Sequence, residues 1–110
     1  MTPLINLVSA DRYPVVLDAL GTLFRDADGF SVVARCLNAA DVRTAVATHQ
    51  PDILVSDVWV NERDPLAFVR ELRADRHATR LVLYSGRMND ELMLEASYLR
   101  VEGVVPKTMP

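Results

Sequence analysis

Four polar side chains stand at the ends of short apolar runs, and they are Asp11, Asp57, Ser85 and Lys107. If those runs are parallel strands, their carboxyl ends share one sheet edge, which is where ligands bind in open α/β folds. The set suggests phosphoryl transfer to a carboxylate, with Asp57 as the nucleophile. Ser85 and Lys107 would contact phosphoryl oxygens by a hydrogen bond and by charge. Acidic residues after the first run, here Asp11, would hold Mg²⁺, a cation that prefers oxygen ligands.

Strand-like and helix-like segments alternate along the chain. The expected strands are 4–9, 30–34, 53–56, 81–85 and 104–106. The expected helices are 14–25, 38–49, 64–74 and one that opens at Asn89 or Asp90. Parallel strands need crossover connections, which helices supply, so the order predicts an α/β fold with a parallel sheet. The runs 53–56 and 81–85 are almost wholly apolar, which is typical of central strands.

Capping residues and apolar spacing predict the helix boundaries and the inward faces. Asn38 is suited to cap the second helix. Asp64 is a capping side chain that is followed by Pro65, a residue favoured at the first helical position. The last helix should turn four apolar side chains inward: Leu92, Met93, Ala96 and Leu99.

The composition is that of one globular domain spanning residues 1–110, with 50% hydrophobic and 25% charged residues. The apolar stretches are too short to cross a membrane. The single cysteine cannot form an internal disulfide, which agrees with a cytoplasmic location. A net charge of −3 gives no electrostatic reason for this segment to bind nucleic acid by itself.

The sequence resembles response-regulator receiver domains, particularly those of LuxR/NarL-type transcription regulators, from about Leu4 to Lys107. The stretches that carry the resemblance are LVSADRYPVVLDAL, PDILVSDVWV, DPLAFVRELR, LVLYSG and EGVVPK. The resemblance implies a flavodoxin-like, doubly wound sheet of five parallel strands in the order 2-1-3-4-5. It also implies a phosphoacceptor at Asp57, with Ser85 and Lys107 contacting the phosphoryl group, and a signalling rather than an enzymatic role.

Three features depart from the family pattern. Arg12 stands where the family has a second acid, which makes the acidic pocket degenerate. Val104 stands at the family's aromatic switch position on the last strand. The loop after the phosphoacceptor position, residues 60–65, lacks the family's glycines.

Arg12 predicts a weakened metal site. A guanidinium offers no lone pair to Mg²⁺ and keeps its charge at any accessible pH. It either pairs with Asp57 in place of the metal or turns to solvent, and leaves Asp11, Asp57 and the carbonyl of Trp59 as metal ligands. In both cases we expect the affinity for the family's Mg²⁺ to fall.

Two functions follow from this resemblance. In the first, a sensor histidine kinase phosphorylates Asp57, and the change is passed to a C-terminal DNA-binding output domain that controls transcription. In the second, the chain is a pseudo-receiver, a dimerisation or protein-interaction module that works without phosphorylation because of Arg12. An aspartyl phosphatase of the haloacid-dehalogenase type would need a second acid where Trp59 stands.

The length adds an expectation about partners. The family fold has five helices, and the sequence stops three residues after Lys107, where the fifth helix should begin. We therefore expect the chain to be the N-terminal part of a longer DNA-binding regulator, or a second copy or partner chain to cover the sheet face that the fifth helix would cover. DNA would be bound only through the output domain.

Overall fold

The computed structural model describes residues 3–61 and 63–107. Five parallel strands form one sheet in the order β2-β1-β3-β4-β5, which confirms the predicted fold class and strand order. The strands are β1 (Ile5–Ala10), β2 (Phe30–Cys36), β3 (Ile53–Asp57), β4 (Arg80–Ser85) and β5 (Gly103–Pro106). The helices are α1 (Pro14–Asp26), α2 (Ala39–His49), the short 3-10 helix η1 (Val58–Val60), α3 (Ala67–Ala74) and α4 (Asp90–Tyr98). None of the helices within the described ranges is long and apolar enough to cross a membrane.

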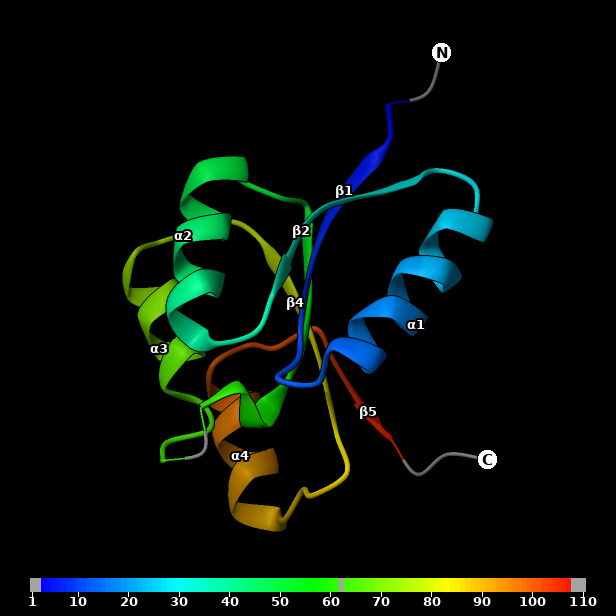
Figure 1. The fold of residues 1–110 in the computed structure, drawn as a ribbon. Coiled ribbons are helices and arrows are strands. Elements are labelled where there is room, and N and C mark those ends of the chain that lie inside the picture. The colour runs from blue at the N-terminus through cyan, green and yellow to red at the C-terminus, as the bar shows by residue number, and fades with distance from the viewer. Residues whose placement is uncertain (1–2, 62, 108–110) are drawn as a thin grey trace.

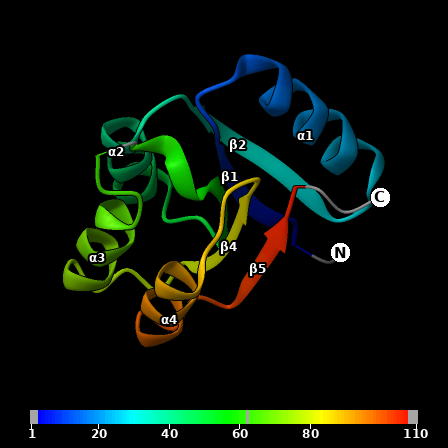
Figure 2. The same cartoon turned by 90° about the horizontal axis from the view of Figure 1, so that it is seen from below.

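The helices are divided unequally between the two faces of the sheet. Figure 1 shows α2, α3 and α4 on one side of the strands and α1 alone on the other. We call these the closed face and the open face. Figure 2 shows that α1 lies over the β1–β2 side, away from β5. The division follows from right-handed crossovers, because only the β1-to-β2 connection runs across the sheet in the opposite direction to the others.

The main core lies on the closed face. Successive strand residues point to opposite faces, and Val8, Leu54 and Leu83 are among the fully buried strand side chains that point toward the helices. Phe68 from α3 and Val46 from α2 pack onto them and are also fully buried.

The open face has a smaller core. Its buried side chains are Leu7, Val55 and Tyr84. Beside them lies an apolar hollow of about 390 Å³ between α1 and strands β3 to β5. Two of its lining residues remain largely exposed, Leu23 at 61% and Val105 at 48%. Four α-helices lie within the described residues, and a fifth after Lys107 would fall outside them.

Local hydrogen bonds explain two of the helix starts. The side chain of Asn38 accepts from the N–H of Asp41 at 2.8 Å, and that of Asn89 accepts from the N–H of Leu92 at 2.8 Å. Asn38 therefore caps its helix as predicted, and of the two residues predicted to open α4, Asn89 is the cap; each satisfies an N–H that has no partner within the helix.

The predicted start of α3 is wrong. The helix begins at Ala67 rather than at Asp64, and no side chain caps it. The Asp64 carboxylate forms an ion pair with Arg70 instead, so it is not available as a cap. Further back along the chain, the 3-10 helix η1 follows β3 directly.

One inward position of α4 is also wrong. Ala96 is buried, and Leu92 and Leu99 pack against the closed-face core as predicted. Met93, however, is 46% exposed. The helix has only nine residues and a weakly amphipathic pattern, so it presents a narrow stripe to the sheet and Met93 falls outside it.

Candidate functional site

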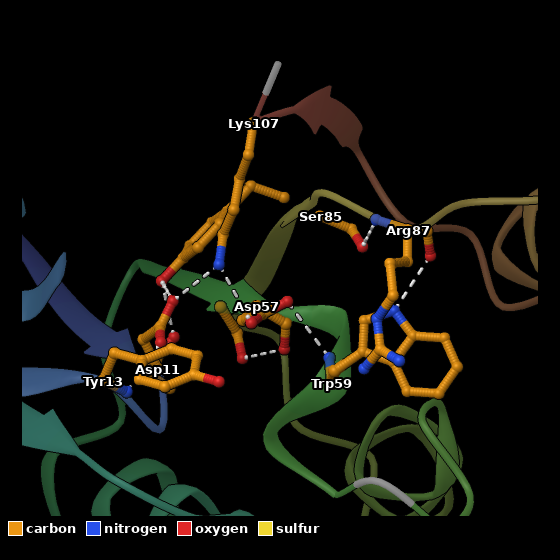
Figure 3. Close-up of polar contacts among 10 residues, drawn as sticks. Asp11, Tyr13, Asp57, Trp59, Ser85, Arg87 and Lys107 are labelled. Carbon is orange, nitrogen blue, oxygen red and sulfur yellow. Dashed lines mark hydrogen bonds and ion pairs between the residues drawn. The ribbon is translucent and has the colours of Figure 1, made fainter.

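The sheet brings the four predicted site residues to one edge. Asp11 directly follows β1, Asp57 ends β3, Ser85 ends β4 and Lys107 directly follows β5. Because β3 lies between β1 and β4, the side chain of Asp57 has neighbours on both sides. Figure 3 shows Asp11, Asp57 and Lys107 converging, with Ser85 near them.

Lys107 joins the two carboxylates. Its Nζ donates to Asp11 Oδ2 at 3.0 Å and to Asp57 Oδ2 at 3.1 Å (Figure 3). Asp11 is 0% and Asp57 4% exposed, whereas the Lys107 side chain keeps 29% of its surface in contact with solvent. Two buried negative charges are costly without a partner, so this ammonium is the group that makes their burial tolerable.

The remaining carboxylate oxygens also accept hydrogen bonds. Asp11 Oδ1 accepts from the backbone N–H of Tyr13 at 2.8 Å, and Asp57 Oδ1 accepts from that of Trp59 at 3.1 Å. The hydroxyl of Tyr84 donates to Asp11 Oδ2 at 3.0 Å and lies 2.8 Å from the carbonyl oxygen of Ala10. All four carboxylate oxygens are thus engaged within the protein.

This arrangement shifts the pKa of both neighbouring groups. Burial lowers the pKa of Lys107, but the hydrogen bonds to Asp11 and Asp57 and their charges outweigh it, so the pKa is raised overall. Burial, followed by the charge of Asp11, raises the pKa of the Tyr84 hydroxyl well above its ordinary value. Both groups therefore stay protonated and act as donors to the carboxylates at neutral pH.

Ser85 belongs to a second set of contacts. Its buried Oγ accepts the backbone N–H of Arg87 at 2.9 Å, which holds the loop after β4. The indole N–H of Trp59 donates to the carbonyl of Arg87 at 2.9 Å, and the Arg87 guanidinium lies 4.2 Å from the Trp59 ring centroid. This clasp ties η1 to the loop after β4 on the Ser85 side of the site.

Arg12 and Val104, two of the residues that differ from the family pattern, lie near the site. The guanidinium of Arg12 lies 4.9 Å from the ring centroid of Tyr13, a cation–π distance. Among the described residues, the cation that contacts Asp57 is Lys107. Val104 is partly buried and packs against the closed-face core, beside Leu83 in the strand register.

These residues do not fit the magnesium site that the family implies. Mg²⁺ takes oxygen ligands in a near-octahedral shell. Only two carboxylates meet here, their oxygens already accept hydrogen bonds, and the side chain at position 12 offers no oxygen. Across residues 3–61 and 63–107, no three His, Cys, Asp or Glu side chains gather closely enough to hold a metal ion.

Sequence reasoning missed Tyr84 and the Trp59–Arg87 clasp. Tyr84 lies in the apolar run 81–85, which predicts a central strand and no role at the site, yet its hydroxyl donates to Asp11. The available signal is its position: it precedes Ser85 on a strand whose end faces the site, and it lies level with Asp57 in the register. Nothing in the spacing of Trp59 and Arg87 indicates their contact, because it depends on how two loops approach each other.

The fold and the site together define a class, a flavodoxin-like α/β domain with carboxylates and a lysine gathered where its parallel strands end. The sequence matches the response regulator receiver domain family over residues 7–110. The chain therefore belongs to the receiver domain family of two-component response regulators.

Solved structures of similar fold include receiver domains of NarL and of LuxR-family response regulators. The signal receiver domain of NarL from Mycobacterium tuberculosis superposes with a TM-score of 0.90 at 17% identity and covers 99% of this chain and 88% of that one. A LuxR-family response regulator from Aurantimonas sp. SI85-9A1 gives a TM-score of 0.86 at 22% identity, over 96% and 75% of the two chains. A curated relative, "Probable C4-dicarboxylate response regulator DctR" of Priestia megaterium, is 25% identical over 69 residues, which are 63% of this chain and 30% of the relative's length.

Proposed function

We propose that this chain is the receiver module of a transcription regulator that signals through protein contacts rather than through Mg²⁺-supported phosphorylation of Asp57. The observation that carries the proposal is the composition of the pocket. Arg12 replaces an oxygen ligand, and Lys107 already bridges the two carboxylates that remain.

Electrostatics favours this choice. A phosphoryl group that approaches Asp57 brings negative charge to a carboxylate that is 4% exposed, so additional cations must neutralise it. A divalent cation would have to displace the Lys107 ammonium, whose Nζ lies 3.0 Å from Asp11 Oδ2 and 3.1 Å from Asp57 Oδ2, and the residue after Asp11 is an arginine rather than an acid. Like charges oppose its binding at such close range. Lys107 can balance the carboxylates of the resting pocket without metal.

The output of the proposed module follows from its relatives. RcsB of Salmonella enterica serovar Typhimurium, which has this fold, has been solved bound to promoter rprA in the presence of the phosphomimetic BeF3⁻. We infer a LuxR-type DNA-binding domain joined to this module, with DNA contacts made there. The open face, with its apolar hollow, is where we expect a second copy or another helix to pack.

A second candidate function is phosphorylation of Asp57 by a sensor histidine kinase. The positions of Asp57, Ser85 and Lys107 at three strand ends favour it. The P–N bond of the donor's phosphohistidine would break as an O–P bond forms at the Asp57 carboxylate, and Lys107 and Ser85 would contact the transferred group. Val104 would then report the change to the output domain.

Mass spectrometry of the intact protein separates the two candidates. The wild type, Arg12→Asp, and Arg12→Asp combined with Asp57→Asn are incubated with acetyl phosphate and Mg²⁺. We expect no phosphoryl adduct on the wild type, an adduct on Arg12→Asp, and none on the double variant. A wild-type adduct that Asp57→Asn abolishes would establish the second candidate instead. Trp59 is the only tryptophan and reports Mg²⁺ binding independently by fluorescence.

A further inference from the structure

We propose that a second site, at the opposite edge of the sheet from Asp57, binds a small molecule through its phosphate or carboxylate group. The site is a hollow of about 670 Å³ between the α2–β3 and α3–β4 connections. Both connections lie where strands begin, whereas Lys107 and the carboxylates lie where strands end (Figure 1). The side chains that would hold the anion are those of Arg76, His77 and Arg80.

The hollow has a fixed frame. Its two connections are joined by the hydroxyl of Thr79, which donates to the carbonyl of Pro51 at 2.9 Å and is buried. The backbone N–H of Arg80 donates to the carbonyl of Asp52 at 3.0 Å, and that of Asp52 donates to the carbonyl of Asn6 at 2.9 Å. A ligand would therefore meet a preformed surface and would not have to order two loops.

The two arginines of the hollow, Arg76 and Arg80, differ from four other arginines of the chain in their charge partners. Four other arginines form ion pairs: Arg35 with Asp18, Arg43 with Glu71 and Asp75, Arg70 with Asp64 and Glu95, and Arg73 with Glu102. Within the described part of the chain, Arg76 and Arg80 have no carboxylate within 4.0 Å. Asp52 also lines the hollow, but its Oδ2 accepts the backbone N–H of Asn6 at 2.8 Å.

Helix capping does not account for these cations. Helices α2 and α3 both end at the hollow, and the partial negative charge of a helix end attracts cations. One carbonyl near the end of each helix accepts a backbone N–H, Val46 that of Gln50 and Leu72 that of His77. Within the described residues the Arg76 guanidinium forms no hydrogen bond or ion pair, so it is available to another acceptor. With Arg80 it outweighs Asp52, so the hollow is locally positive on a chain whose net charge is −3.

Two left-handed residues shape the rim of the hollow. Gln50 and Arg76 border the hollow in left-handed conformations, with φ of 44° and 59°. Residues with side chains adopt this region rarely, and they keep it where the surrounding structure imposes it. Here it turns the chain sharply at the end of each helix, which sets the two connections on either side of the hollow.

The lining also indicates the kind of ligand. The planar guanidinium of an arginine matches the paired oxygens of phosphate and carboxylate. Two guanidinium groups together with His77 suit an oxyanion that accepts several hydrogen bonds. Ile5, Ile53 and Ala78 supply apolar surface beside them. The volume lies in the range of about 300–1,000 Å³ usual for small-molecule sites. The ligand class is therefore a compact molecule with one oxyanion group and an apolar body.

Amide chemical shifts of the ¹⁵N-labelled 110-residue chain test the proposal. Inorganic phosphate, phenyl phosphate, acetate and benzoate are titrated against sodium chloride at matched ionic strength. We expect saturable shifts confined to the amides of residues 50, 52, 53 and 76–80, with phenyl phosphate binding more tightly than inorganic phosphate. If the carboxylates bind and the phosphates do not, the oxyanion is a carboxylate.

Two matched variants decide the role of the arginines. Arg76→Gln combined with Arg80→Gln should weaken binding about tenfold or more. Arg100→Gln is the control, because Arg100 is also exposed and left-handed, with φ of 58°, but lies outside the hollow. Urea unfolding establishes that each variant is folded. Shifts that chloride reproduces, shifts at Asp57 alone, no saturation, or equal binding by the double variant would each overturn the proposal.

Discussion

The two faces of the sheet are built differently. The closed face is held by apolar packing, with α2, α3 and α4 over side chains such as Val8 and Leu54 that are 0% exposed. The open face carries α1 alone and leaves Leu23 61% exposed. Its largest buried side chain, Tyr84, is fixed by hydrogen bonds at the site.

This contrast indicates that the two faces have different roles. Close packing on one side fixes the strands, and the strands fix the positions of Asp11, Asp57 and Lys107. The other side is joined to the site through Tyr84 and still has apolar surface to cover. A change at the site should therefore shift side chains on the open face more readily than side chains in the core of the closed face.

The largest effect is expected for Phe68→Ala on the closed face. Phe68 is 0% exposed, so its truncation leaves a cavity and should lower the free energy of unfolding by about 3–5 kcal/mol. Phe24→Ala makes the same change on the open face, where Phe24 is only partly buried, and should cost less than half as much. Urea titrations give both values. Equal losses would show that the two faces are packed alike.

The second effect is a pH dependence of the closed core. Burial, with a contribution from the charge of Asp41, raises the pKa of Cys36 to about 11. Below the ordinary pKa of 9.0 both the folded and the unfolded chain keep the thiol proton. As the pH rises above this value, the unfolded chain loses the proton first, so stability falls until the folded thiol also ionises.

The loss attributable to Cys36 should be about 1–2 kcal/mol between pH 8.5 and pH 11. The measurement is the free energy of unfolding of the wild type and of Cys36→Ala at several pH values. Lys107 and Tyr84, whose pKa values are also raised, contribute to both proteins, so the difference isolates the thiol. Parallel pH profiles would mean that Cys36 is not desolvated in the closed core.

Much of the fold was accessible from the sequence because it depends on local patterns. The apolar runs of β3 and β4 indicate central strands, and Asn38 and Asn89 mark helix starts by bonds within one turn. The start of α3 was not accessible. Asp64 has the right type and position for a cap, but its carboxylate forms an ion pair with Arg70, six residues further along, and does not cap the helix.

The site could be predicted only in part, because some of its contacts follow from strand ends and others depend on how separate segments meet. Strand-end positions predict that Asp11, Asp57 and Lys107 meet, since parallel strands end at one edge. Spacing carries no information about the hydroxyl of Tyr84 on Asp11, which joins residues 73 positions apart. The place of Arg12 beside Tyr13 likewise depends on the loop conformation after β1.

The third effect is expected for Tyr84→Phe, which tests the polar anchor of the open face. The change removes the hydroxyl that donates to the carboxylate of Asp11 and lies 2.8 Å from the carbonyl oxygen of Ala10. We expect the free energy of unfolding to fall by about 1–2 kcal/mol. Tyr98→Phe is the matched control, because Tyr98 is 78% exposed, and should change it by less than about 0.5 kcal/mol. A loss no larger than that of the control would show that packing alone holds Tyr84.

The smallest effect is expected for Leu23→Ala in the dilute chain, because Leu23 is 61% exposed. The free energy of unfolding should change by less than about 0.5 kcal/mol, whereas Leu72→Ala on the closed face should cost about 2–5 kcal/mol. Repeating the Leu23→Ala measurement at rising protein concentration sharpens the comparison. If a second copy covers the open face, the wild type gains stability with concentration and the variant gains less. A large loss at every concentration would instead mean that Leu23 is buried within one chain and that the open face is not open.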